Sequence, residues 1–148
     1  MKKWEHETTI SASIEDVWSL FDYSFEQMKK IKPELISLDL VEQAEEFVGS
    51  VYRQVYKKRR VVQEHFITIL DHKDTTDYKL LKTTFDLPGM LRVTNKYELK
   101  KLSEKETSLK TKIINEPLRW DMKFLLLFAG KKPAVDLCKQ VRNVAEAN

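Results

Sequence analysis

The chain has 148 residues, of which 42% are hydrophobic and 33% are charged, with 26 basic and 23 acidic side chains. This composition is typical of a globular protein with a substantial core, so we expect a single domain over residues 1–148. The net charge of +3 is small and spread along the chain, which argues against nucleic acid as a partner.

The cysteine content and the N-terminus bear on the cellular compartment. The one cysteine, Cys138, cannot form an intramolecular disulfide, which fits a reducing environment. The first ten residues begin with lysines but turn acidic where a signal peptide has its apolar segment. We therefore expect a cytoplasmic protein.

The pattern of residues 4–33 predicts one strand followed by two short helices. Residues 4–10 alternate in the manner of a half-buried strand. Ser13 lies three residues before Asp16, a variant of the capping box, and apolar residues follow at helical spacing. Ser24 begins a second capping pattern, and Pro33 disfavours helical geometry at the residue before it. Both predicted helices therefore lie between residues 13 and 33.

The middle of the chain predicts six antiparallel strands. Its segments are rich in β-branched and aromatic residues and are joined by short turn sequences, which favour antiparallel neighbours. The clearest turn is LPGM, in which Pro88 and Gly89 suit the central positions of a type II turn. The predicted strands cover residues 35–43, 48–57, 61–71, 77–86, 90–102 and 106–115.

After Pro117 the apolar residues return to helical spacing, which predicts a long C-terminal helix over residues 118–147. Gly130 and Pro133 are expected to bend or interrupt this helix, because a proline lacks the amide that an interior position donates.

Six consecutive apolar residues, 124–129, lie within this predicted helix. A membrane-spanning helix needs about 20 apolar residues, and Lys123 and Lys131 end the run far short of that. We therefore expect no membrane span. Because consecutive helical residues point in all directions, other elements should cover this segment on several sides.

Several motifs together resemble the helix-grip superfamily, also called SRPBCC. They are an alanine-serine pair followed by valine and tryptophan, a glycine at the opening of a strand, and the closing DLCKQVRNVAE segment, namely Ala12, Ser13, Val17, Trp18, Gly49 and residues 136–146. The superfamily includes StAR-related lipid-transfer domains, birch-pollen-allergen-like proteins, and polyketide cyclases and dehydrases. Such motifs indicate a fold and do not identify a reaction.

The resemblance implies an α+β helix-grip fold. A curved antiparallel sheet of about seven strands would wrap around the long C-terminal helix, with two short helices after the first strand. A largely apolar cavity would lie between the sheet and this helix. Trp120, Phe124 and Phe128 would then border the cavity.

The two-residue period of a strand predicts which other side chains face that cavity. Strand 48–57 weakly favours Tyr52 and Tyr56, and strand 61–71 does not distinguish its faces, although we include Phe66. The other expected cavity residues are Leu91, Val93, Asn95 and Tyr97 in strand 90–102, and Leu109, Thr111 and Ile113 in strand 106–115.

No catalytic, metal or cofactor site is predicted. Glu64 and His65 are adjacent in a strand, so they point to opposite faces and cannot share a substrate proton. The three histidines lack metal-ligand spacing, and Cys138 falls on an apolar helix face where packing explains it. The basic run 57–60 is expected to be a solvated hairpin tip.

Three functions remain open. The favoured one is binding or transport of a small apolar or amphipathic molecule, lipid-like or polyketide-like, in the cavity. The second is a polyketide cyclase or dehydratase type of enzyme, for which the sequence shows no committed acid and base. The third is a protein-interaction module of the chaperone-activator or ribosome-associated type, which a cavity filled by side chains would favour.

Overall fold

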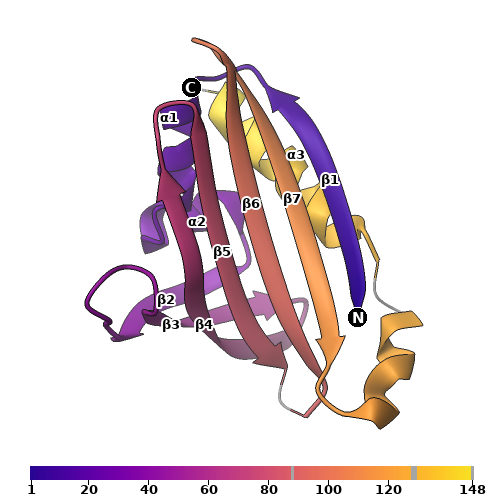
Figure 1. Ribbon diagram of the computed structural model, residues 1–148. Helices are drawn as coiled ribbons and strands as arrows, with labels where there is room; N and C mark the ends of the chain where they lie inside the picture. The colour runs from indigo at the N-terminus through magenta and orange to yellow at the C-terminus, as the bar shows by residue number, and fades with distance from the viewer. Residues whose placement is uncertain (88, 128–129, 148) are drawn as a thin grey trace.

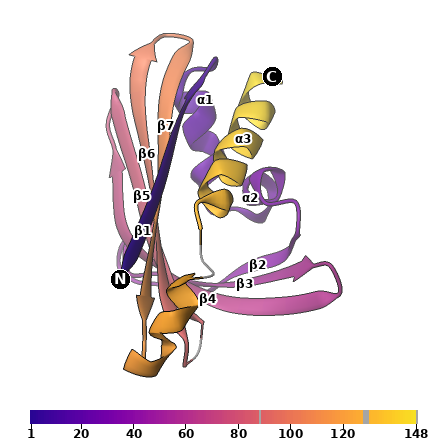
Figure 2. The same ribbon diagram turned by 90° about the vertical axis from the view of Figure 1, so that its right-hand side faces the viewer.

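A computed structural model describes residues 1–148 except 88, 128, 129 and 148, without the side chains of residues 124–127. Seven strands form one antiparallel sheet in the order β1-β7-β6-β5-β4-β3-β2, with β1 (Lys2–Ile10) and β2 (Leu35–Glu42) at its edges. The sheet curves strongly, and the α-helices lie on its concave side (Figures 1 and 2). The predicted α+β helix-grip architecture is therefore confirmed.

A helical connection crosses the concave side from one edge strand to the other. The Ser13 hydroxyl accepts a hydrogen bond from the Asp16 amide at 3.2 Å, and the Ser24 hydroxyl accepts one from the Gln27 amide at 3.3 Å. Both predicted helix caps are thus confirmed. The connection consists of α1 (Ile14–Trp18), the 3-10 helix η1 (Ser19–Phe21) and α2 (Phe25–Ile31).

The other strands follow the predicted segments closely. Gly49 precedes the first of them with a φ of 94°, and a Cβ atom there would lie 3.2 Å from that of Ala44, so glycine is required. At the LPGM turn, Gly89 has a φ of 70°, but the predicted type II geometry depends on Pro88, which lies outside the described residues. The strands are β3 (Val51–Lys58), β4 (Val61–Asp74), β5 (Tyr78–Leu87), β6 (Leu91–Ser103) and β7 (Glu106–Pro117).

The C-terminal helix α3 (Lys132–Glu146) begins later than predicted. Residues Trp120–Leu127 form a separate 3-10 helix, η2, which lies beside the end of β7 (Figure 2). The predicted helical region from residue 118 is therefore interrupted, as expected at Gly130 and Pro133, and its second part is the α-helix α3. Pro133 lies in the first turn of α3, where a missing amide breaks no helical hydrogen bond, so the helix begins there.

The core fills one end of the concave side. Apolar residues of α3 recur every three to four positions and are buried, among them Cys138 and Val141. They meet buried residues of β1, α1, η1, β6 and β7, including Ile10, Val17, Phe21, Leu99 and Leu109. Among the described residues, no helix is long and apolar enough to cross a membrane.

Candidate functional site

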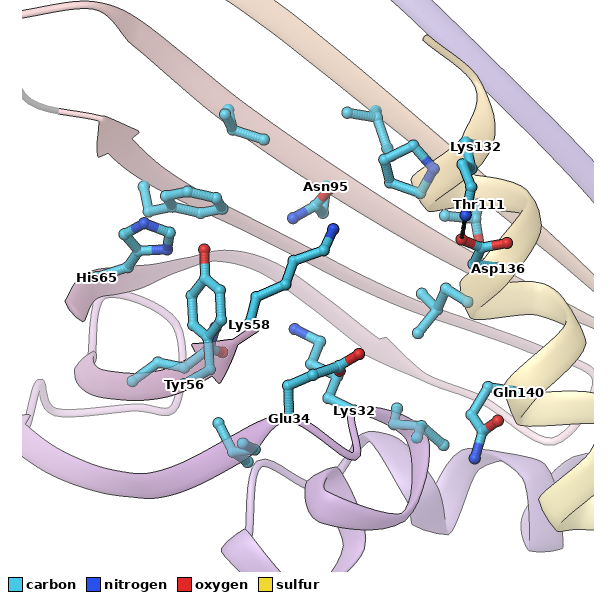
Figure 3. Close-up of a pocket in the computed structure, with 18 of the residues that line it drawn as sticks. Lys32, Glu34, Tyr56, Lys58, His65, Asn95, Thr111, Lys132, Asp136 and Gln140 are labelled. Carbon is cyan, nitrogen blue, oxygen red and sulfur yellow. Dashed lines mark hydrogen bonds and ion pairs between the residues drawn. The ribbon is translucent and has the colours of Figure 1, made fainter. Parts of the chain in front are cut away.

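A cavity of about 820 Å³ lies at the other end of the concave side (Figure 3). Strands β3 to β7 form its floor, and the α2–β2 connection and the first turns of α3 form its sides. Sites for small molecules usually have volumes of about 300–1,000 Å³. The cavity is therefore large enough for an organic molecule.

The strand period places part of the predicted set on this wall. Alternate residues of β6 and β7 face the concave side, and the register pairs Asn95 with Ile113 and Tyr97 with Thr111. The predicted residues that line the cavity are Tyr56, Val93, Asn95, Tyr97, Thr111 and Ile113. Their role in binding a ligand stays a prediction.

Three predicted residues lie in the core and are not among the described lining. Tyr52 is half-buried and its ring lies 5.0 Å from that of Tyr23, so it packs against the helical connection. Leu91 and Leu109 are buried. They lie on the inward face as predicted, and Leu109 packs in the main core.

Two predicted residues lie on the surface, so their placement at the cavity was wrong. Phe66 is 51% exposed, because the neighbouring His65 and Ile67 take the concave face of β4. Trp120 is 83% exposed, because η2 lies beyond the end of the sheet. The side chain of Phe124 and the whole of Phe128 lie outside the described residues.

Other cavity residues were not predicted. Gln54 lies between Tyr52 and Tyr56 on the same strand face, so the two-residue period could have identified it. Phe85 lies on β5, to which no inward face had been assigned. The α2–β2 connection and α3 contribute Lys32, Glu34, Lys132, Asp136, Leu137 and Gln140, which no strand pattern could indicate.

His65 belongs to an aromatic cluster on the cavity wall. Its ring stacks on Phe85 at 4.4 Å and lies edge-on to Tyr56 at 5.1 Å. Burial and then the charge of Lys32 lower the pKa of His65, so it is neutral at neutral pH. His65 is 6% exposed, and its buried Nδ1 has no hydrogen-bond partner among the described residues. The opposite orientations of His65 and Glu64 agree with the rejection of that pair as an acid and base.

Lys32 brings a positive charge to the cavity. It caps the C-terminus of α2, because Pro33 follows it and prevents further helix. Lys29 fixes this connection by donating hydrogen bonds to the carbonyls of Pro33 at 2.6 Å and Leu35 at 2.7 Å. The half-buried Lys32 side chain points into the cavity, and burial lowers its pKa to about 8.

Further charged residues lie around Lys32. Lys58, from the predicted hairpin tip, reaches into the cavity, although it is exposed. Residues 57–60 are all exposed, as expected of a hairpin tip, and Lys58 lines the cavity as well. Lys132 and Asp136 form an ion pair at 2.8 Å at the start of α3. Glu34 belongs to the same α2–β2 connection as Lys32.

Cys138 lies deep in the structure beneath the cavity. Its thiol donates a hydrogen bond to the Thr111 hydroxyl at 3.3 Å, and burial raises its pKa, so it stays protonated. This environment fits a packing role. Among the described residues, no group of three or more potential ligands could hold a metal ion.

Neither a protein-family model nor a curated protein matches the sequence. Solved structures do match over almost the whole chain. A START superfamily protein from Mycobacterium smegmatis is 12% identical, with a TM-score of 0.76 over 98% of this chain and 97% of that one. The Zhui aromatase/cyclase from Streptomyces is 14% identical, with a TM-score of 0.73 over 98% and 93%.

Norcoclaurine synthase from Thalictrum flavum, in complex with a transition-state analogue, is 12% identical, with a TM-score of 0.72 over 97% of this chain and 93% of that one. At these identities, the likeness concerns the fold and leaves the reaction and the ligand open. The strand order, the helical crossover and the C-terminal helix agree with it. The chain therefore has the helix-grip fold.

Proposed function

We propose that the protein binds a small amphipathic molecule in the cavity between the sheet and α3. The observation that carries this proposal is a cavity of about 820 Å³ with two kinds of wall. Phe85, Val93 and Leu137 offer apolar surface, whereas Gln54 and Asn95 offer amides that can orient a polar group. Ligand sites commonly combine a largely apolar lining with a few convergent polar groups.

The test is to find the molecule and then block its site. Native mass spectrometry of the protein purified from its own host should show an added mass that is lost on denaturation. Val93→Trp should abolish this added mass, because the indole would occupy part of the cavity. Lys100→Trp is the matched control, because Lys100 is an exposed residue of the same strand whose side chain lies on the opposite face.

Retention of the added mass by folded Val93→Trp would show that the molecule binds elsewhere. No added mass, together with no saturable binding of amphipathic probes, would contradict the proposal.

Catalysis on such a molecule is a second candidate. Lys32 has a pKa of about 8, and the neutral His65 is also on the cavity wall, so both groups can exchange protons near neutral pH. Turnover of a polyketide-like substrate that is lost in His65→Phe, with binding retained, would favour an enzyme. The open cavity gives no support to the third possibility, a protein-interaction module with a filled interior.

A further inference from the structure

The cavity carries unbalanced positive charge. Lys32 and Lys58 come from different elements, and Figure 3 shows both side chains pointing into the space that Asn95 faces from the sheet. Among the described residues, neither lysine has an ion-pair partner, whereas Lys132 is paired with Asp136. Buried or partly buried charges in proteins are usually paired. Lys32 is half-buried and unpaired among the described residues, which indicates a missing counter-charge, and the exposed Lys58 adds a second positive charge at the same cavity.

The charged residues around the cavity indicate how much negative charge a ligand would have to bring. Glu34 is the one cavity carboxylate without an ion pair among the described residues, so the two free lysines leave one positive charge in excess. The first turn of α3 also lies at the cavity wall and presents the positive end of a helix of 15 residues. A singly charged anion matches this balance better than a dianion.

The remaining wall describes the rest of the ligand. Phe85, Val93, Ile113 and Leu137 form apolar surface on the sheet and on α3. His65 is neutral, so it adds no charge to the wall, and its buried Nδ1 has no hydrogen-bond partner among the described residues. Burial of apolar carbon against this surface supplies most of the affinity, and the charged end sets the orientation.

We propose that Lys32 and Lys58 form the anion subsite of this cavity, and that the ligand is an amphipathic monocarboxylate whose apolar part lies against Phe85, Val93 and Leu137. This inference rests on the proposed function, because it specifies the class of molecule bound at the same site. The low pKa of Lys32 agrees with it, because a carboxylate would supply the stabilisation that burial removes from the ammonium group.

The test compares decanoate, decanol and decylamine, which share one chain and differ in charge. Each displaces a fluorescent dansyl-undecanoate probe at pH 7, and calorimetry confirms the affinities. Decanoate should bind about tenfold more tightly than decanol, and decylamine should bind most weakly. A tenfold change corresponds to about 1.4 kcal/mol, which is within the range of one charge-assisted hydrogen bond.

The lysine variants identify the subsite. Lys32→Met and Lys58→Met should each weaken decanoate binding about tenfold and leave decanol binding unchanged. Lys57→Met is the matched control, because this neighbouring lysine is exposed and does not line the cavity. Lys32→Arg keeps the charge and should retain part of the affinity.

The outcomes separate the two proposals. Equal binding of decanoate and decanol, unchanged by either lysine variant, would overturn the anion subsite and leave the cavity as a binding site. Absence of binding by all the probes would overturn both. Tighter binding of decyl phosphate than of decanoate would contradict a monocarboxylate and indicate a dianion.

Discussion

Two lysines in different regions of the molecule differ in whether carboxylates compensate their positive charge. Lys79 on β5 is 1% exposed, yet its ammonium pairs with Asp74 and with Glu15, at 2.9 Å from the latter, and lies 5.9 Å from the Trp18 ring. Burial alone would lower the pKa of Lys79, but its hydrogen bonds with the two carboxylates raise it. Lys32 has no such partner in the part of the chain that the structure describes, and burial lowers its pKa to about 8.

Because of this difference, we interpret Lys79 as a structural charge and Lys32 as a candidate ligand-binding charge. The Lys79 cluster connects β5, the β4–β5 hairpin and α1, and its polar groups satisfy one another. The Lys32 ammonium has no carboxylate partner among the described residues, and it lines the cavity. Four predictions test this contrast, in order of decreasing effect.

Removing the partners of Lys79 should have the largest effect. Glu15→Ala with Asp74→Ala should lower the free energy of unfolding by about 3 kcal/mol, because a buried ammonium group is left uncompensated. Adding Lys79→Met should restore most of that loss. Urea unfolding at pH 7 measures all three proteins, and a triple variant no more stable than the double would show that the carboxylates act without Lys79.

Removing the charge of Lys32 should have the opposite sign. Lys32→Met should raise the free energy of unfolding by about 1–3 kcal/mol at pH 7, because a disfavoured ammonium group becomes an apolar side chain of similar length. The same variant should lose decanoate affinity. A loss of stability in Lys32→Met would indicate that Lys32 stabilises the fold.

The stability gain in Lys32→Met should depend on pH. The folded-state pKa of about 8 lies below the ordinary value of 10.5, so between these values the unfolded chain binds more protons at this residue. The penalty in the wild type is full below pH 8, shrinks as pH rises and is absent above 10.5. Glu34, Lys58 and His65 also face the cavity, but both proteins contain them, so the difference isolates Lys32. A difference that stays constant from pH 7 to 10.5 would contradict this assignment.

The smallest effect is expected for Asp74→Asn alone. Asp74 is half exposed and Glu15 still balances Lys79, so the loss at pH 7 should be below about 1 kcal/mol. The hydrogen bond from Lys79 holds the pKa of Asp74 below 3.8, so its contribution is present above that pH and is lost as pH falls through the folded-state pKa. Acid unfolding of wild type and variant should therefore converge once the pH is below the folded-state pKa of Asp74. A gap that persists there would point to packing.

Most of the elements could be predicted from the sequence, because their signals are local. Ser13 and Ser24 cap helices through hydroxyls that bond to amides three residues away, and Gly49 has a backbone conformation that few other residues adopt. Alternation along β6 and β7 likewise predicted that Asn95, Tyr97 and Thr111 face inward.

The composition of the site depended on tertiary structure. Alternation defines two strand faces but does not decide which is buried when both carry apolar residues, so Phe66 was chosen where His65 faces inward. Lys58 and His65 come from the neighbouring strands of one hairpin, but Lys32 precedes β2, and sheet curvature and the crossover of α2 bring it to the same cavity. Whether a lysine is paired, like Lys79, or unpaired, like Lys32, depends on neighbours that only the folded chain supplies, because electrostatic interactions act over distances in space and not along the sequence.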